Sequence, residues 1–350
     1  MKNQKYYNLF ILLSTFSRSI IDIYSVVYLY QRFNNIKDII LIYLLVYFLG
    51  IFISIFALQI GTRFGYKYSL ILSQIMTITS FYLNKQSTNI LLISGSLSLS
   101  IFTYHPIRHY FGIKLLKNKS LIGKTLIINY LGVLIASFFI IRDLSIIYLV
   151  IISIIGIIPV FCLKDRHENR IVYPKKIPIR KISFFIFDQA KIIFLLLEPL
   201  YLYKVSKTIS FIGIFNIILT VSSIIYVYLI ANKLNIEKIY CYLNIIFVII
   251  LLLKLNITSK YLLLIVAFLE GIGIKTNELI STLNLYNYQE NRSFTGYLII
   301  SEVIFCVIRV LILGWMYISN ISLKKMMYLL LIGIFILSFM YQKRDSKSLS

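Results

Sequence analysis

The sequence has few of the residues that build redox, metal or nucleotide sites in soluble proteins. Its three cysteines, Cys162, Cys241 and Cys306, are far apart and lie in or near apolar runs, which excludes a disulfide framework and a cysteine metal cluster. The 14 glycines form no phosphate-binding loop, and no Ser/His/Asp or Cys/His set can be assembled. The start of the chain lacks the small-residue cleavage site of a signal peptide.

Long apolar runs dominate the chain instead. Of its 350 residues 59% are hydrophobic, and the mean hydropathy is +0.85, which is not typical of a soluble domain. Apolar runs of about 20 residues recur, and each is long enough to span roughly 30 Å of hydrocarbon. We therefore predict an all-α polytopic membrane protein with about twelve transmembrane helices. The predicted spans are 6–30, 37–60, 69–84, 87–105, 121–141, 143–163, 183–203, 208–231, 239–254, 259–280, 294–317 and 323–341.

Acidic residues are scarce and basic residues are common. The chain has 13 Asp and Glu and 36 Lys and Arg, which gives a net charge of +23. Such a charge is one sign of nucleic-acid binding, but basic cytoplasmic loops are the simpler explanation. With both termini inside, the inner segments hold 21 Lys and Arg and the outer loops hold 10, among which we count Lys254 at the end of the span 239–254. This bias predicts a multi-pass protein of the cell membrane with both termini cytoplasmic and with no nucleic-acid partner.

The chain shows signs of two halves. Its longest hydrophilic stretch, Lys164–Lys181, separates six predicted spans from six, as a linker between membrane halves would. The tripeptide Tyr-Leu-Tyr at 28–30 returns at 201–203, an offset of 173 that also places Arg18 on Lys191. We predict an N-terminal six-helix bundle over 1–163, a basic cytoplasmic linker over 164–182, a C-terminal six-helix bundle over 183–341 and a tail over 342–350.

A few charged side chains lie inside the predicted spans. A charge in hydrocarbon costs roughly 2.5–3.5 kcal/mol even on a lenient scale, so such residues usually face a protein interior or a water-filled cavity. Apart from charges near the ends of spans, such as Lys124 in the fifth, they occur on spans one, seven, ten and eleven, which we expect to surround a common cavity. The predicted substrate or ion pathway consists of Arg18, Asp22, Asp188, Lys191, Glu198, Glu270, Glu302 and Arg309.

Two interpretations of these residues stay open. Arg18 and Asp22 are four residues apart and can form a buried pair that only orients helices, as can Asp188 and Lys191. Alternatively, five acids against three bases leave carboxylates unpaired, and an unpaired buried carboxylate can carry a proton. Glu270 is the first candidate because no base lies near it on its own helix face, and Asp22 is the second. The bases could hold an anionic substrate, and the acids could equally hold a cationic one.

Metal binding is not expected. His105 and His109 have the spacing of two ligands on one helical turn, but Pro106 lies between them and no third ligand is evident. We expect no metal and no cofactor, and we expect a monomer in the lipid bilayer.

The loop after the second span carries a recognisable pattern. It resembles the signature loop between the second and third helices of the major facilitator superfamily, roughly Gly-x-Leu-Ala-Asp-Arg-x-Gly-Arg-Arg/Lys. Arg63, Gly65 and Lys67 match this pattern, whereas Thr62 replaces the Asp and Leu58 replaces the first Gly. The resemblance implies two six-helix halves around a central cavity, alternating access commonly driven by protons, and a cytoplasmic gate loop at the three matching residues.

We therefore predict a secondary active transporter, not an enzyme, that moves a small solute across the cytoplasmic membrane by proton-coupled alternating access. One alternative is a membrane enzyme of surface-polysaccharide assembly, such as a polymerase or glycosyltransferase. Such enzymes generally need a sizeable outer loop, and no predicted outer loop here is longer than a few residues. The other alternative is a degenerate, non-transporting membrane partner, which the departures in the signature loop keep open.

Overall fold

The structure is a computed structural model, and it describes residues 2–116, 119–142, 146–164, 171, 179–228, 236–286, 294–319 and 321–345. These residues form fourteen α-helices, and no strand occurs in the ranges just given. The helices are α1 (Lys2–Phe33), α2 (Ile36–Phe64), α3 (Tyr66–Gln86), α4 (Ile90–Phe102), α5 (His105–Leu115), α6 (Lys119–Ile141), α7 (Ile146–Ile155), α8 (Ile157–Phe161), α9 (Ile179–Ser206), α10 (Ile209–Tyr226), α11 (Ile236–Asn256), α12 (Lys260–Tyr286), α13 (Phe294–Ile318) and α14 (Leu323–Asp345).

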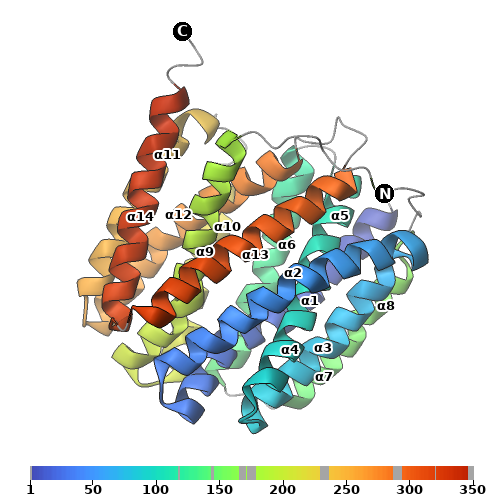
Figure 1. Ribbon diagram of the computed structural model, residues 1–350, viewed down its shortest axis with the longest axis horizontal. Coiled ribbons are helices and arrows are strands. Elements are labelled where there is room, and N and C mark those ends of the chain that lie inside the picture. The colour runs from blue at the N-terminus through green and yellow to red at the C-terminus, as the bar shows by residue number, and fades with distance from the viewer. Residues whose placement is uncertain are drawn as a thin grey trace.

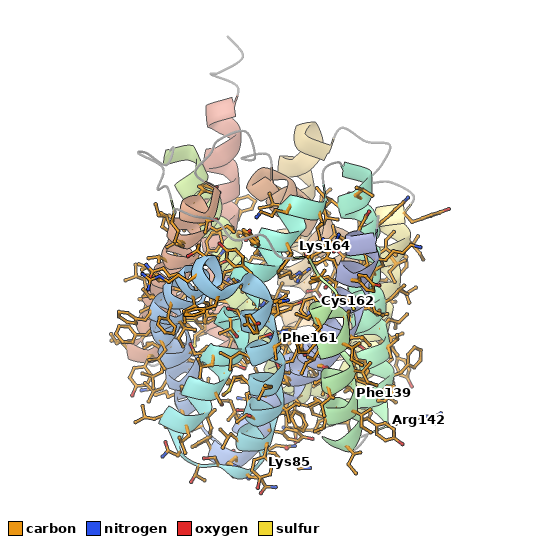
Figure 2. All side chains as sticks on the ribbon, turned by 90° about the vertical axis from the view of Figure 1, so that its right-hand side faces the viewer. Lys85, Phe139, Arg142, Phe161, Cys162 and Lys164 are labelled. Carbon is orange, nitrogen blue, oxygen red and sulfur yellow. The ribbon has the colours of Figure 1, made fainter. Side chains whose placement is uncertain are left out.

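Six of the described helical segments are long and apolar enough to cross a membrane. They are Asn3–Phe33, Ile36–Phe64, Ile90–Leu115, Leu121–Ile141, Ile209–Tyr226 and Thr295–Ile318. Large apolar side chains project from the outside of the bundle (Figure 2); on α2, for example, Phe48, Phe52 and Phe56 repeat every four residues on one exposed face. The chain is therefore a multi-pass membrane protein whose outer surface suits lipid. The full count of about twelve spans stays a prediction.

The predicted span 87–105 is a broken helix that continues beyond its predicted end. α4 stops at Phe102, and α5 starts at His105 and runs to Leu115. The break has a cause in Pro106, because a proline ring within a helix clashes with the carbonyl four residues earlier. In the first turn of α5, by contrast, the missing N–H of proline removes no helical hydrogen bond.

The helices pack in two groups that follow chain order. We call α1–α8 the first group and α9–α14 the second. In the first group α1 packs against α3 and α6, and α4 packs against α2 and α3. In the second group α9 packs against α14, and α11 packs against α12 and α14. The groups meet where α2 runs beside α13, as Figure 1 shows, and where α6 packs against α10. α9 begins at Ile179, inside the predicted linker 164–182, most of which lies outside the described residues.

The two ends of the bundle can be told apart in the figures. Both chain termini lie toward the same end of the bundle in Figure 1. Lys85 and Arg142 lie at the opposite end in Figure 2, whereas Lys164 lies nearer the termini. We call the end with Lys85 and Arg142 the distal end.

The turn between α2 and α3 is made by one residue, Gly65. Its φ of 102° lies in a region that L side chains rarely adopt, and its N–H donates to the carbonyl of Gly61 at 3.0 Å. A glycine is therefore required at the position where the sequence matches the signature loop. The assignment of Arg63, Gly65 and Lys67 to a cytoplasmic gate remains a prediction.

Candidate functional site

A cavity of about 510 Å³ lies between the two helix groups. Its volume is within the range of small-molecule sites, roughly 300–1,000 Å³. The described lining comes from α1, α2, α4, α5 and α6 in the first group and from α9, α10 and α13 in the second. The charged lining residues are Asp22, Asp188, Glu198, Glu302 and Arg309.

Five of the eight predicted pathway residues are thus brought together in one cavity. They come from α1, α9 and α13, which correspond to three of the four spans expected to surround it. Glu270 on α12 lies outside the described lining. Neutral side chains of α2, α4, α6 and α10 also line the cavity. The positions of embedded charges in the sequence could not predict these helices as part of the lining.

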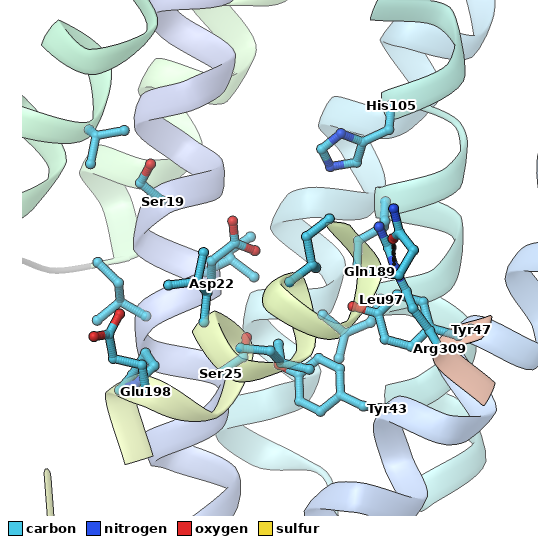
Figure 3. A pocket seen from close by; sticks show the side chains of 18 of the residues that line it. Ser19, Asp22, Ser25, Tyr43, Tyr47, Leu97, His105, Gln189, Glu198 and Arg309 are labelled. Atoms are coloured by element: carbon cyan, nitrogen blue, oxygen red, sulfur yellow. Dashed lines mark hydrogen bonds between the residues drawn. The ribbon is translucent and has the colours of Figure 1, made fainter. Parts of the chain in front are cut away.

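Two carboxylates of the cavity, Asp22 and Glu302, have neither a hydrogen bond nor an ion pair within the part of the chain that the structure describes. Asp22 is exposed to the cavity although Ile21 and Ile23 beside it are buried (Figure 3). Glu302 keeps only 5% of its surface exposed and also lines the cavity. A charge on Glu302 is costly because that side chain is buried, and Asp22 presents its carboxylate to the cavity, so both are candidates to bind a proton or a cation.

Arg18 does not form the buried pair with Asp22 that their spacing allows. Its Nη2 donates to the carbonyl of Ser100 on α4 at 2.8 Å, and its guanidinium carbon lies 3.8 Å from the centre of the Tyr104 ring. Among the described residues no ion pair joins Arg18 to Asp22. Arg18 and Asp22 are therefore not joined by an ion pair here, and the carboxylate of Asp22 lines the cavity.

A buried lysine that the topology prediction placed in an outer loop, Lys254, is the centre of an ionic cluster. Its Nζ lies 2.7 Å from Oε2 of Glu270 and also pairs with Glu198. Lys254 and Glu270 are both fully buried. The outer-loop assignment was wrong because the long aliphatic stem of a lysine near a helix end can carry the ammonium into the bundle. The cluster joins α9, α11 and α12.

This cluster changes the interpretation of Glu270. No base lies near Glu270 on its own helix face, but Lys254 reaches it from the neighbouring helix α11. Glu198 connects the cluster to the cavity because it both pairs with Lys254 and lines the cavity. The candidates to bind a proton or a cation are therefore Asp22 and Glu302 rather than Glu270.

Arg309 is held by side chains from two other helices. Its Nε donates to Oε1 of Gln189 on α9 at 2.6 Å, and its guanidinium lies 4.8 Å from the centre of the Tyr47 ring on α2 (Figure 3). Gln189 in turn donates to Asp188 at 3.3 Å. Gln189 and Tyr47 were not predicted from the sequence, because neither a single glutamine nor one of 28 tyrosines is distinctive of a site.

Lys191 lies outside the described lining of the cavity. It is buried, and its ammonium lies 5.3 Å from the centre of the Phe247 ring. Arg18 and Lys191, which the offset of 173 pairs, therefore both pack against aromatic rings away from the cavity. Of the three bases that could have held an anionic substrate, only Arg309 is among the described lining residues.

The end of the Tyr-Leu-Tyr repeat brings α1 and α9 into contact at the distal end. Nε2 of Gln31 donates to the hydroxyl of Tyr203 at 2.8 Å, and the ammonium of Lys204 lies 4.9 Å from the centre of the Tyr30 ring. At the offset of 173, Tyr30 corresponds to Tyr203 and Gln31 to Lys204. Each half therefore supplies one tyrosine and one polar side chain. In each contact the tyrosine of one half meets the polar side chain of the other half.

The chain matches no protein-family model, and no curated protein matches it in sequence. Solved structures nevertheless share its architecture over nearly its whole length. The human organic anion transporter MFSD10 is 10% identical with a TM-score of 0.69, covering 97% of this chain and 98% of its own. The E. coli fucose:proton symporter FucP is 12% identical with a TM-score of 0.63, covering 97% and 98%. A bacterial homologue of the iron transporter ferroportin, in an outward-facing state, is 13% identical with a TM-score of 0.64, covering 99% and 100%.

At these identities the likeness establishes the fold. The chain has the major facilitator fold, and the prediction made from Arg63, Gly65 and Lys67 in the loop after the second span is confirmed at this level.

Proposed function

We propose that this protein is a secondary active transporter that moves a small solute across the cell membrane by alternating access, with protons as the coupling ion. The observation that carries the proposal is the cavity between the two helix groups, where Asp22 and Glu302 form neither a hydrogen bond nor an ion pair among the described residues. The three similar structures are transporters by title, which favours transport over a polysaccharide polymerase or glycosyltransferase. In this proposal the protein acts as a monomer with both termini in the cytoplasm.

The presence of these carboxylates argues against a degenerate partner. Charged side chains at membrane depth are costly and usually have a function, and a proton or cation would stabilise both of these. Asp22 lies on α1 and Glu302 on α13, so each helix group presents one carboxylate to the cavity. A proton taken up from one side and released to the other would couple solute movement to the proton gradient. One of the three similar structures is by title a fucose:proton symporter, which agrees with this coupling.

The distal contacts supply a gate for alternating access. One is a hydrogen bond between Gln31 and Tyr203 and the other a cation–π contact between Lys204 and Tyr30. Each is worth about 0.5–1.5 kcal/mol, so both can break while the helices stay folded. Rocking one helix group against the other would separate these side chains and open the cavity at the distal end.

The test is transport in proteoliposomes with an imposed pH gradient, first screened with a panel of radiolabelled small solutes. The gate is then locked with the pair Gln31→Cys and Tyr203→Cys, in a background without the three native cysteines. A short bis(methanethiosulfonate) reagent joins each cysteine through a reducible disulfide, because two long side chains that meet at their tips leave the backbones too far apart for a direct disulfide. We expect crosslinking to stop gradient-dependent flux and a reductant to restore it.

A matched control uses another distal pair within one helix group. The hydroxyl of Tyr328 on α14 donates to Asn256 on α11 at 2.5 Å. Crosslinking Asn256→Cys to Tyr328→Cys with the same reagent should leave flux unchanged, because these helices move together. Undiminished flux with the locked Gln31–Tyr203 pair would overturn alternating access at this gate. The absence of gradient-dependent flux for any solute would overturn the coupling.

A further inference from the structure

The cavity is acidic. Its described lining has four carboxylates, Asp22, Asp188, Glu198 and Glu302, against the single guanidinium of Arg309. Arg309, Asp188 and Glu198 are each bonded to a neighbouring side chain. Glu302, which is buried to 95%, and Asp22 are the charged groups of this lining that have neither a hydrogen bond nor an ion pair among the described residues. Electrostatics therefore favour a positively charged occupant and oppose an anionic one.

Aromatic rings share the cavity with these carboxylates. Tyr43 and Tyr47 on α2, Phe102 on α4, Tyr130 on α6 and Phe305 on α13 are among the lining residues. The face of an aromatic ring attracts organic cations, and a desolvated contact is worth about 2 kcal/mol. An inorganic cation would favour a shell of oxygen ligands instead. The ring content of the lining thus indicates a cation that carries an organic part.

A backbone acceptor without its usual helical donor lies on a helix that lines the cavity. Pro199 lies inside α9 and lines the cavity, as does Leu195 one turn earlier. Because proline has no N–H, the carbonyl of Leu195 cannot receive the usual helical hydrogen bond from position 199. A carbonyl at membrane depth needs another donor. An ammonium group of a substrate offers such donors, whereas a carboxylate does not.

We propose that the substrate is an organic amine in its protonated form, with its ammonium held by Asp22 and Glu302 and its apolar part against the aromatic lining. The carboxylates come from different helix groups, so one bound ammonium would contact a carboxylate of each group. This inference rests on the proposed transport function, because it names the solute class for the same cavity. The fold alone does not imply it, since one similar structure is an organic anion transporter by title.

The test is equilibrium binding to the purified full-length protein in detergent, which requires no transport. The probes are 3-phenylpropylammonium and 3-phenylpropionate, which share a ring and a short chain but carry opposite charges. We expect saturable binding of the ammonium compound and none of the carboxylate. Asp22→Asn and Glu302→Gln should each weaken binding about tenfold or more, because each removes a close charge–charge contact.

Two further variants make the test specific. Asp38→Asn neutralises a carboxylate in the first turn of α2, outside the cavity lining, and should leave the affinity unchanged. Glu302→Asp keeps the charge and should retain more affinity than Glu302→Gln. Size-exclusion profiles and melting temperatures check that each variant is folded.

The outcomes separate this inference from the proposed function. Binding of the carboxylate probe in preference to the ammonium probe would overturn the inference. So would the absence of saturable ammonium binding, or unchanged binding in both Asp22→Asn and Glu302→Gln. Saturable ammonium binding without flux in proteoliposomes would instead overturn the proposed transport function and leave the cation site standing.

Discussion

The two helix groups stabilise their buried polar residues in different ways. In the first group, α1–α8, neutral side chains bond across helices, as when Thr15 on α1 donates to Asn129 on α6 at 2.7 Å. In the second group, α9–α14, Lys254 is paired with both Glu198 and Glu270. Neutral hydrogen bonds in membranes average about 0.6 kcal/mol, whereas removing one partner of a buried ion pair costs about 3–5 kcal/mol. The second group should therefore be far more sensitive to a single substitution.

The exception in the first group supports the same distinction. Arg18 is a buried charge, but its described contacts are with the carbonyl of Ser100 and the ring of Tyr104 rather than with a carboxylate. Protonation of a carboxylate would break an ionic contact in the second group and leave these neutral contacts intact. We infer that the first group is the more constant part of the bundle and the second the part whose contacts respond to protons.

The largest expected effect is on the second group. Lys254→Met leaves Glu198 and Glu270 buried without their cation and should lower the free energy of unfolding by about 3–5 kcal/mol. Unfolding followed by denaturant titration in mixed micelles measures this loss. Lys260→Met, at the exposed start of α12, is the matched control and should change stability little. Equal stability of the two variants would show that the ionic cluster does not form, and adding Glu270→Gln to Lys254→Met should recover part of the loss.

An intermediate effect is expected from the backbone of the first group. Gly65→Ala places a side chain at φ 102° and should destabilise the protein by about 1–2 kcal/mol. The matched control is Gly95→Ala in α4, where an added Cβ would meet nothing within 4 Å. There the change should stabilise by about 0.5–1 kcal/mol, because alanine favours a helix interior. Melting temperatures of the two variants that move in the same direction would contradict this account.

The smallest effect is expected from the neutral contacts. Thr15→Val removes the hydrogen bond to Asn129 and should cost about 0.6 kcal/mol. Thr79→Val serves as the control, because its hydroxyl bonds only to the carbonyl of Ile75 on its own helix. Unfolding free energies from the same denaturant assay compare the two with Lys254→Met. A loss from Thr15→Val as large as that from Lys254→Met would end the distinction between the helix groups.

Much of the fold and part of the site could be predicted from the sequence. Apolar length and basic loops predicted a helical multi-pass membrane protein, because in lipid each spanning segment must satisfy its own backbone hydrogen bonds. The loop with Arg63, Gly65 and Lys67 predicted the fold. A glycine is needed at position 65 because the backbone there has a positive φ. Five of the eight embedded charges reach one cavity, because helical spacing already places such residues on common faces.

Which of these charges meet one another was decided only by the tertiary structure. Spacing on one helix suggested a pair between Arg18 and Asp22, but Arg18 turns to α4 and leaves Asp22 in the cavity. Glu270 was predicted to be unpaired, but in the structure it forms an ion pair with Lys254 of α11. Such partners depend on how far each helix is rotated and how close its neighbours pack, which the pattern of a single segment does not contain. The sequence by itself determined that charges lie inside the bundle, and the packing of helices determined which of them remain available to bind a proton or a substrate.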